Sequence, residues 1–157
     1  MSAHRILVID DQPEMLEAFR RVITYMGHYP EIVDYARDRA RIDSLLTQYR
    51  FSLCFLDLWL EDPDAMQERG LVPEKAQDLL HRLERLGVPT IVMTRHWNHR
   101  QPADEWLEAF SAAALNKDDV YNHGPEAEDG LRQLIAERLA DAIRLMAAEG
   151  MDPAAST

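Results

Sequence analysis

Residues 5–11 read Arg5-Ile6-Leu7-Val8-Ile9-Asp10-Asp11, a short run of aliphatic side chains that ends on two acids. Such a run is typical of a buried β-strand. Pro13 then opens a helical pattern, because proline suits the first turn of a helix, and Gly27 ends it. The apolar face of this predicted helix contains Met15, Leu16, Phe19, Val22, Ile23 and Met26. The chain therefore begins with a strand and an amphipathic helix.

The same alternation of strand and helix continues along the chain. Further strands are predicted at 29–35, 51–57, 90–94 and 114–116, and further helices at 37–49, 73–86, 103–113 and 126–148. Residues 51–57 are nearly all apolar, as expected of a strand buried on both faces of a parallel sheet. Five strand and helix units predict an α/β fold with right-handed crossovers and helices on both faces of the sheet.

Size and composition indicate one globular domain. The chain has 157 residues, of which 46% are hydrophobic, and this suffices for a complete core. Its 17 basic and 28 acidic residues give a formal net charge of −11, which argues against direct binding to nucleic acid or membranes. No apolar run is long enough to cross a bilayer, so we expect a cytoplasmic protein. The single cysteine, Cys54, cannot form an internal disulfide and is expected to be buried.

Five polar residues lie at or beside the predicted carboxyl ends of strands. They are Asp10, Asp11, Asp57, Thr94 and Lys117. In open parallel sheets these ends form one edge, where ligands bind. Three carboxylates at one edge repel one another unless a cation binds between them, and an all-oxygen set suits Mg²⁺. A hydroxyl and an ammonium opposite them would bind the oxygens of a phosphoryl group.

The residues at these strand ends resemble the receiver domain of two-component response regulators. The matching segments are Ile9-Asp10-Asp11, Phe55-Leu56-Asp57, Val92-Met93-Thr94 and Leu115-Asn116-Lys117. The resemblance implies a flavodoxin-like (βα)5 fold, doubly wound, with a five-stranded parallel sheet of order 2-1-3-4-5. It implies a receiver domain at 4–148 and a short tail at 149–157. We expect an atypical single-domain member of this family.

By this resemblance, Asp57 accepts a phosphoryl group from a histidine kinase or a phosphotransfer protein. The resemblance assigns Mg²⁺ to four ligands: Asp10, Asp11, Asp57 and the backbone carbonyl of Trp59. Thr94 and Lys117 would contact the phosphoryl group. The chain would then be a phosphorylation-dependent signalling module, and not an enzyme, that acts by contact with a downstream protein target. The long predicted helix at 126–148 would also allow a homodimer.

Two residues beside the phosphoryl pocket depart from the family pattern. Arg95 follows Thr94 where the family usually has a small residue, and His96 comes next. Arg95 would either bind the phosphoryl group or occupy its place, and in the second case the chain is a non-phosphorylated pseudo-receiver that acts as a scaffold or dimerisation module. An equally weighted alternative is that Arg95 points into solvent and pairs with Glu61 or Asp62. His96 would help to shield the phosphoryl group from water.

Three further departures concern the loops and the output surface. Lys117 is followed by Asp118 and not by proline, so we expect a trans peptide bond there. Ala114 stands where the family has an aromatic switch residue, so the signal must reach the surface in another way. The interval before the fourth strand is longer than usual, which predicts an extended loop at 60–72.

Other interpretations of the same residues are weaker. An Asp10-Asp11 pair taken alone is typical of a helix N-cap or turn. A Mg²⁺-dependent phosphohydrolase with Asp57 as its nucleophile is the enzyme alternative, but the related haloacid dehalogenase phosphatases carry their nucleophile on the first strand. No second convergent pair of ligands supports a zinc site at His96, His99 and His123.

Overall fold

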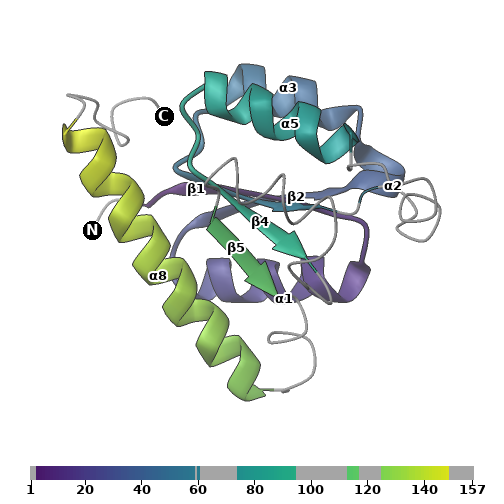
Figure 1. The fold of residues 1–157 in the computed structure, drawn as a ribbon. Helices are drawn as coiled ribbons and strands as arrows, with labels where there is room; N and C mark the ends of the chain where they lie inside the picture. The colour runs from purple at the N-terminus through teal and green to yellow at the C-terminus, as the bar shows by residue number, and fades with distance from the viewer. Residues whose placement is uncertain (1–2, 59, 61–73, 95–112, 117–124, 149–157) are drawn as a thin grey trace, which may run out of the picture.

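The computed structural model describes residues 3–58, 60, 74–94, 113–116 and 125–148, and its centre is a parallel sheet (Figure 1). The strands are β1 (Arg5–Asp10), β2 (Tyr29–Asp34), β3 (Leu53–Asp57), β4 (Thr90–Thr94) and β5 (Ala113–Asn116). They form one five-stranded sheet in the order β2-β1-β3-β4-β5, and all neighbours are parallel. The predicted α/β fold and its strand order 2-1-3-4-5 are confirmed.

Helices cover both faces of this sheet. They are α1 (Pro13–Tyr25), α2 (Tyr35–Asp38), α3 (Arg41–Gln48), α5 (Glu74–Arg85) and α8 (Pro125–Ala148). Helices α3 and α5 lie on one face, and α1 and α8 lie on the other (Figure 1). In the part of the chain that the structure describes, no helix is both long and apolar enough to cross a membrane.

The central strands bury side chains on both faces in alternation. On β1, Leu7 and Ile9 belong to the core beneath α3 and α5, whereas Ile6 and Val8 belong to the core beneath α1 and α8. Burial of each such side chain is worth about 1.5–3 kcal/mol, so a shift of one residue in register would be costly. Cys54 of β3 is buried as predicted, and burial raises the pKa of its thiol well above the ordinary range.

The segment between β2 and β3 differs from the sequence expectation. One helix was expected at 37–49, but the chain forms two, α2 and α3. Asp34 explains the earlier start, because its carboxylate accepts a hydrogen bond from the backbone N–H of Ala36 at 3.1 Å and so caps α2. Helix α3 begins anew at Arg41, in a register that buries one face against the sheet: Ile42, Leu45 and Leu46.

Smaller differences concern where strands begin. β3 starts at Leu53 and not at Phe51, although both side chains are buried. β5 starts at Ala113, so the helix predicted at 103–113 is at least one residue too long, and 103–112 lie outside the described residues. Of the extended loop predicted at 60–72, the structure describes Leu60, which is buried.

Two glycines mark the ends of helices at the predicted places. Gly27 follows α1 with φ of 82°, and Gly87 follows α5 with φ of 72°. Both values lie in the left-handed region, where a side chain would introduce strain. After Gly27 the chain enters β2, and after Gly87 it runs towards β4.

Candidate functional site

Asp10 and Asp57 are the last residues of two neighbouring strands, β1 and β3. Ile9 and Leu56 are partners across these strands, so the next residue on each strand, the aspartate, comes to the same edge of the sheet. Asp11 follows directly in the chain. The topology alone therefore gathers three carboxylates that are far apart in the sequence.

Each of these three residues offers a carboxylate oxygen, and the three oxygens lie within 4.8 Å of one another. We call Asp10, Asp11 and Asp57 the acid cluster. Asp10 is 0% exposed and Asp57 is 2% exposed, whereas Asp11 is exposed to solvent. The cluster thus has two buried members inside the sheet edge and one member at its surface.

Asp10 also shapes the backbone at the start of α1. Its Oδ1 accepts hydrogen bonds from the backbone N–H of Asp11 at 2.6 Å and of Gln12 at 3.0 Å. The prediction that the aspartate pair forms a turn is therefore confirmed for Asp10. It is compatible with metal binding, because the hydrogen bonds of the turn hold the carboxylate of Asp10 within the acid cluster. The second oxygen, Oδ2, is buried as well.

The electrostatics of the cluster favour a bound cation. Carboxylates this close repel one another, and burial of two of them removes much of the screening by water. The amino end of α1, which begins at Pro13, supplies a partial positive charge that offsets a fraction of this repulsion. A set of carboxylate oxygens at such spacing fits Mg²⁺, a hard cation that prefers oxygen ligands. The residues present therefore suit the predicted metal.

The backbone brings one further predicted residue to the same edge. Met93 of β4 is the partner of Asp57, and Thr94 follows as the last residue of the strand. The side chain of Thr94 is not among those that the structure describes, and four predicted site residues lie outside the described residues altogether: Trp59, Arg95, His96 and Lys117. Their roles stay predictions.

A second polar cluster, not predicted from the sequence, lies at the opposite edge of the sheet, where three strands begin. His4, His28 and Ser52 directly precede β1, β2 and β3. The backbone N–H of His4 donates to Nδ1 of His28 at 3.1 Å, and Nδ1 of His4 lies 2.8 Å from Oγ of Ser52. We call these residues the amino-end cluster. The same rule about aligned strand ends, applied to the starts of the strands, would have found it.

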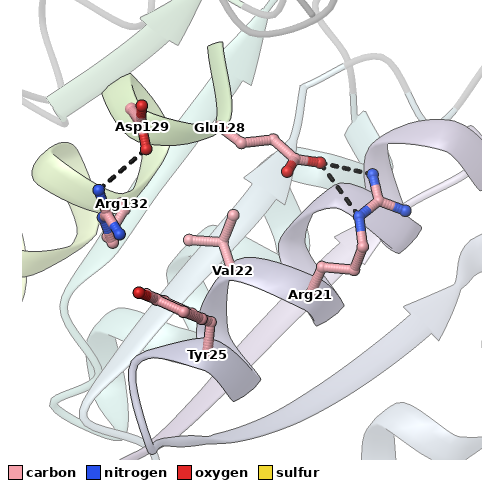
Figure 2. Close-up of a pocket in the computed structure, with 6 residues that line it drawn as sticks. All are labelled: Arg21, Val22, Tyr25, Glu128, Asp129 and Arg132. Atoms are coloured by element: carbon pink, nitrogen blue, oxygen red, sulfur yellow. Dashed lines mark hydrogen bonds and ion pairs between the residues drawn. The ribbon is translucent and has the colours of Figure 1, made fainter. Parts of the chain in front are cut away.

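A surface groove runs between α1 and α8 (Figure 2). Its volume is about 420 Å³, and its lining consists of Arg21, Val22, Tyr25, Glu128, Asp129 and Arg132. Arg21 donates to Glu128 at 2.6 Å, and Arg132 donates to Asp129 at 2.9 Å. Both guanidinium groups are thus ion-paired, and no residue of the acid cluster lines the groove.

Comparison with known proteins agrees with this architecture. No family model and no curated protein matches the sequence. Among solved structures, a response regulator receiver domain protein (CheY-like) from Methanospirillum hungatei JF-1 has a TM-score of 0.62 at 20% identity, over 91% of this chain and 98% of that one. A response regulator receiver protein from Burkholderia phymatum has a TM-score of 0.59 at 19% identity, over 87% and 95%. This chain has the receiver-domain fold.

The receiver fold also occurs within longer proteins. NtrX from Brucella abortus matches with a TM-score of 0.63 at 17% identity, and the match covers 94% of this chain but 30% of that one. At such identities the comparison establishes the fold, and the function has to be argued from the site. In this receiver fold, the acid cluster lies where the sequence resemblance implies a phosphoacceptor site.

Proposed function

We propose that this chain is a phosphorylation-dependent signalling module of a two-component or phosphorelay system, with Asp57 as the phosphoacceptor. The observation that carries the proposal is the acid cluster: three carboxylates within 4.8 Å at the carboxyl edge of a receiver fold. Such a cluster is costly to maintain unless a cation binds there. The domain would extend over residues 4–148.

Asp57 is the best nucleophile among the three acids. Oδ1 of Asp10 already accepts two backbone hydrogen bonds, which lower its electron density. Asp11 is exposed and follows the strand rather than ending it. Asp57 ends the central strand β3, whose preceding residues Phe55 and Leu56 are packed in the cores on opposite faces of the sheet. A rigid position of this kind favours in-line attack on a phosphorus atom.

In the proposed step, an oxygen of Asp57 forms a bond to the phosphorus of the donor. The bond between phosphorus and the donor's leaving group breaks, and that group departs with the electron pair. Thr94 and Lys117 would bind the phosphoryl oxygens through a hydroxyl and an ammonium. Mg²⁺, held by Asp10, Asp11, Asp57 and the backbone carbonyl of Trp59, would neutralise negative charge at the site.

The donor would be a histidine kinase or a phosphotransfer protein, and the output would be contact with a downstream protein target. The net charge of −11 supports a protein partner over nucleic acid or an anionic membrane. On this proposal the chain is a cytoplasmic phosphoprotein rather than an enzyme with turnover. A homodimer stays a prediction, as does the Arg95-locked scaffold.

The test is intact-mass spectrometry after incubation with acetyl phosphate, with and without Mg²⁺. Wild type should gain one phosphoryl group only when Mg²⁺ is present, and Asp57→Ala should gain none. Glu14→Ala is the matched control, because it removes an exposed acid from the first turn of α1 without touching the cluster. Equal addition to Asp57→Ala would refute the assignment. No addition to wild type would refute it too, and would make Arg95→Ala the next variant.

A further inference from the structure

The amino-end cluster joins three strands through one histidine. The backbone N–H of His4 donates to Nδ1 of His28, and the carbonyl of His4 accepts the N–H of Tyr29 at 2.8 Å. Its ring nitrogen Nδ1 lies 2.8 Å from Oγ of Ser52, in a buried contact. Because His4 precedes β1, these three contacts tie the start of β1 to the starts of both its neighbours, β2 and β3.

The contact with His28 fixes the protonation state of its ring. A nitrogen that accepts a hydrogen bond carries no proton, so His28 is neutral with its proton on Nε2. Protonation of Nδ1 would turn an acceptor into a donor that faces another donor, the N–H of His4. The hydrogen bond at this point therefore exists only while His28 is neutral.

The surroundings also oppose charge on either ring. Burial lowers the pKa of His4, and burial together with the neighbouring His4 lowers the pKa of His28. The two ring centroids are 5.6 Å apart, so a double positive charge would be repulsive. Among the described residues, neither histidine forms an ion pair with a carboxylate that would compensate a charge.

The charged and titratable groups on the surrounding elements do not offset the cost of protonating His4 or His28. From β1, Arg5 pairs with Glu31 at 2.8 Å, and its guanidinium carbon lies 3.9 Å from the centroid of the Tyr49 ring. From β2, Tyr29 lies beside Arg5, 5.2 Å from its guanidinium. Arg50 precedes Ser52 by two residues and adds positive charge near the start of β3.

We propose that His4 and His28 form a proton-sensitive hydrogen-bonded pair, which holds the starts of β1 and β2 together at neutral pH and loosens them on acidification. Ser52 links His4 to the start of β3, and its hydroxyl can donate to a neutral His4 ring or accept from a charged one. This role is independent of the proposed phosphoacceptor site, because it lies at the opposite end of the strands. It gives the domain a response to pH that uses no residue of the acid cluster.

The direction of the response follows from the two histidines. Their pKa values in the folded chain lie below the ordinary value of 6.5, so the unfolded chain binds protons first as the pH falls. The histidine contribution to stability is thus complete above about pH 6.5 and declines as the pH drops from there towards the lowered values.

The experiment compares melting temperatures at about pH 7.5 and about pH 5.5 in wild type and His28→Asn, across the range in which histidine titrates. Asparagine places Oδ1 where histidine has Nδ1, so it accepts the His4 N–H at either pH. The fall in melting temperature on acidification should shrink by about half or more in this variant. His81→Asn, which removes a partly exposed histidine of α5, should show the wild-type fall. A wild-type fall in His28→Asn overturns the proposal.

A measurement on the unmodified protein covers the case in which His28→Asn fails to fold. Imidazole ¹⁵N spectra at neutral pH should show His28 with its proton on Nε2, and both rings should titrate with midpoints below 6.5, their ordinary value. A proton on Nδ1 of His28, or midpoints at the ordinary value, would overturn the proposal without any variant.

Discussion

The carboxyl edge and the amino edge of the sheet hold opposite kinds of polar cluster. At the carboxyl end, Asp10, Asp11 and Asp57 bring like charges together, and the cluster becomes favourable only with a cation from outside. At the amino end, His4 and its partners are neutral and satisfy one another by hydrogen bonds. In this chain the parallel strands align polar residues at both edges of the sheet. The charged carboxyl edge is suited to a ligand, and the neutral amino edge contributes to stability.

Asp10→Ala should have the largest effect, because this residue serves both the acid cluster and the turn before α1. Loss of its carboxylate leaves two backbone N–H groups without their acceptor. We expect this loss to exceed the repulsion that is relieved at Asp11 and Asp57, and the free energy of unfolding to fall by about 1–2 kcal/mol. Phosphate uptake from acetyl phosphate should also be lost. Urea denaturation without Mg²⁺ measures the first effect, and a variant at least as stable as wild type would contradict the dual role.

Asp11→Ala should separate ligand binding from stability. Asp11 is exposed, so without metal the free energy of unfolding should change by no more than about 0.5 kcal/mol. Mg²⁺ should raise the melting temperature of wild type, because a ligand that binds only the folded state stabilises it. That rise should be much smaller in Asp11→Ala and unchanged in Glu14→Ala. An undiminished rise in Asp11→Ala would remove this residue from the metal site.

Ser52→Ala should lower stability and leave phosphate uptake unchanged, the reverse of the result expected for Asp11→Ala. Removal of Oγ leaves Nδ1 of His4 without a buried partner, which should cost about 0.5–1.5 kcal/mol in the free energy of unfolding. Phosphate uptake should stay at the wild-type level, because Ser52 and the acid cluster lie at opposite ends of β3. Denaturation and uptake measured on one preparation test this contrast, and a loss of uptake in the folded variant would show that the two ends are coupled.

Arg21→Ala should have the smallest effect of the series. Glu128 raises the pKa of the Arg21 guanidinium through a hydrogen bond and charge attraction, but the pair is solvent-exposed and screened by salt. The melting temperature should therefore match wild type within experimental scatter, at low and at high salt. A clear destabilisation would mean that the contact between α1 and α8 depends on this pair more than on the buried Val22 and Leu131.

The strand order and the acid cluster were predictable because their signals are local. Aliphatic runs that end on acids, with glycines after the helices, indicate where each strand stops, and parallel topology then places the ends together. The early start of α2 was missed because it depends on the side chain of Asp34 as a cap. The amino-end cluster was missed because its residues match no motif, although His4, His28 and Ser52 lie at the aligned starts of three parallel strands.

The remaining predictions concern residues outside the described part of the chain. Trp59, Arg95, His96 and Lys117 carry the roles that the family resemblance implies, and the extended loop at 60–72 belongs with them. Sequence alone could not decide whether Arg95 binds a phosphoryl group, replaces it or points into solvent, because an arginine side chain is long and has several rotatable bonds.

The most direct test of the central claim locates the phosphoryl group on the chain. Borohydride reduces an acyl phosphate to an alcohol, so a phosphorylated aspartate becomes homoserine at that position. After treatment with acetyl phosphate and Mg²⁺, followed by borohydride, peptide mapping should find homoserine at position 57 and aspartate at positions 10 and 11. Homoserine at position 10 or 11, or at none of the three positions, would contradict the assignment of Asp57 as the phosphoacceptor.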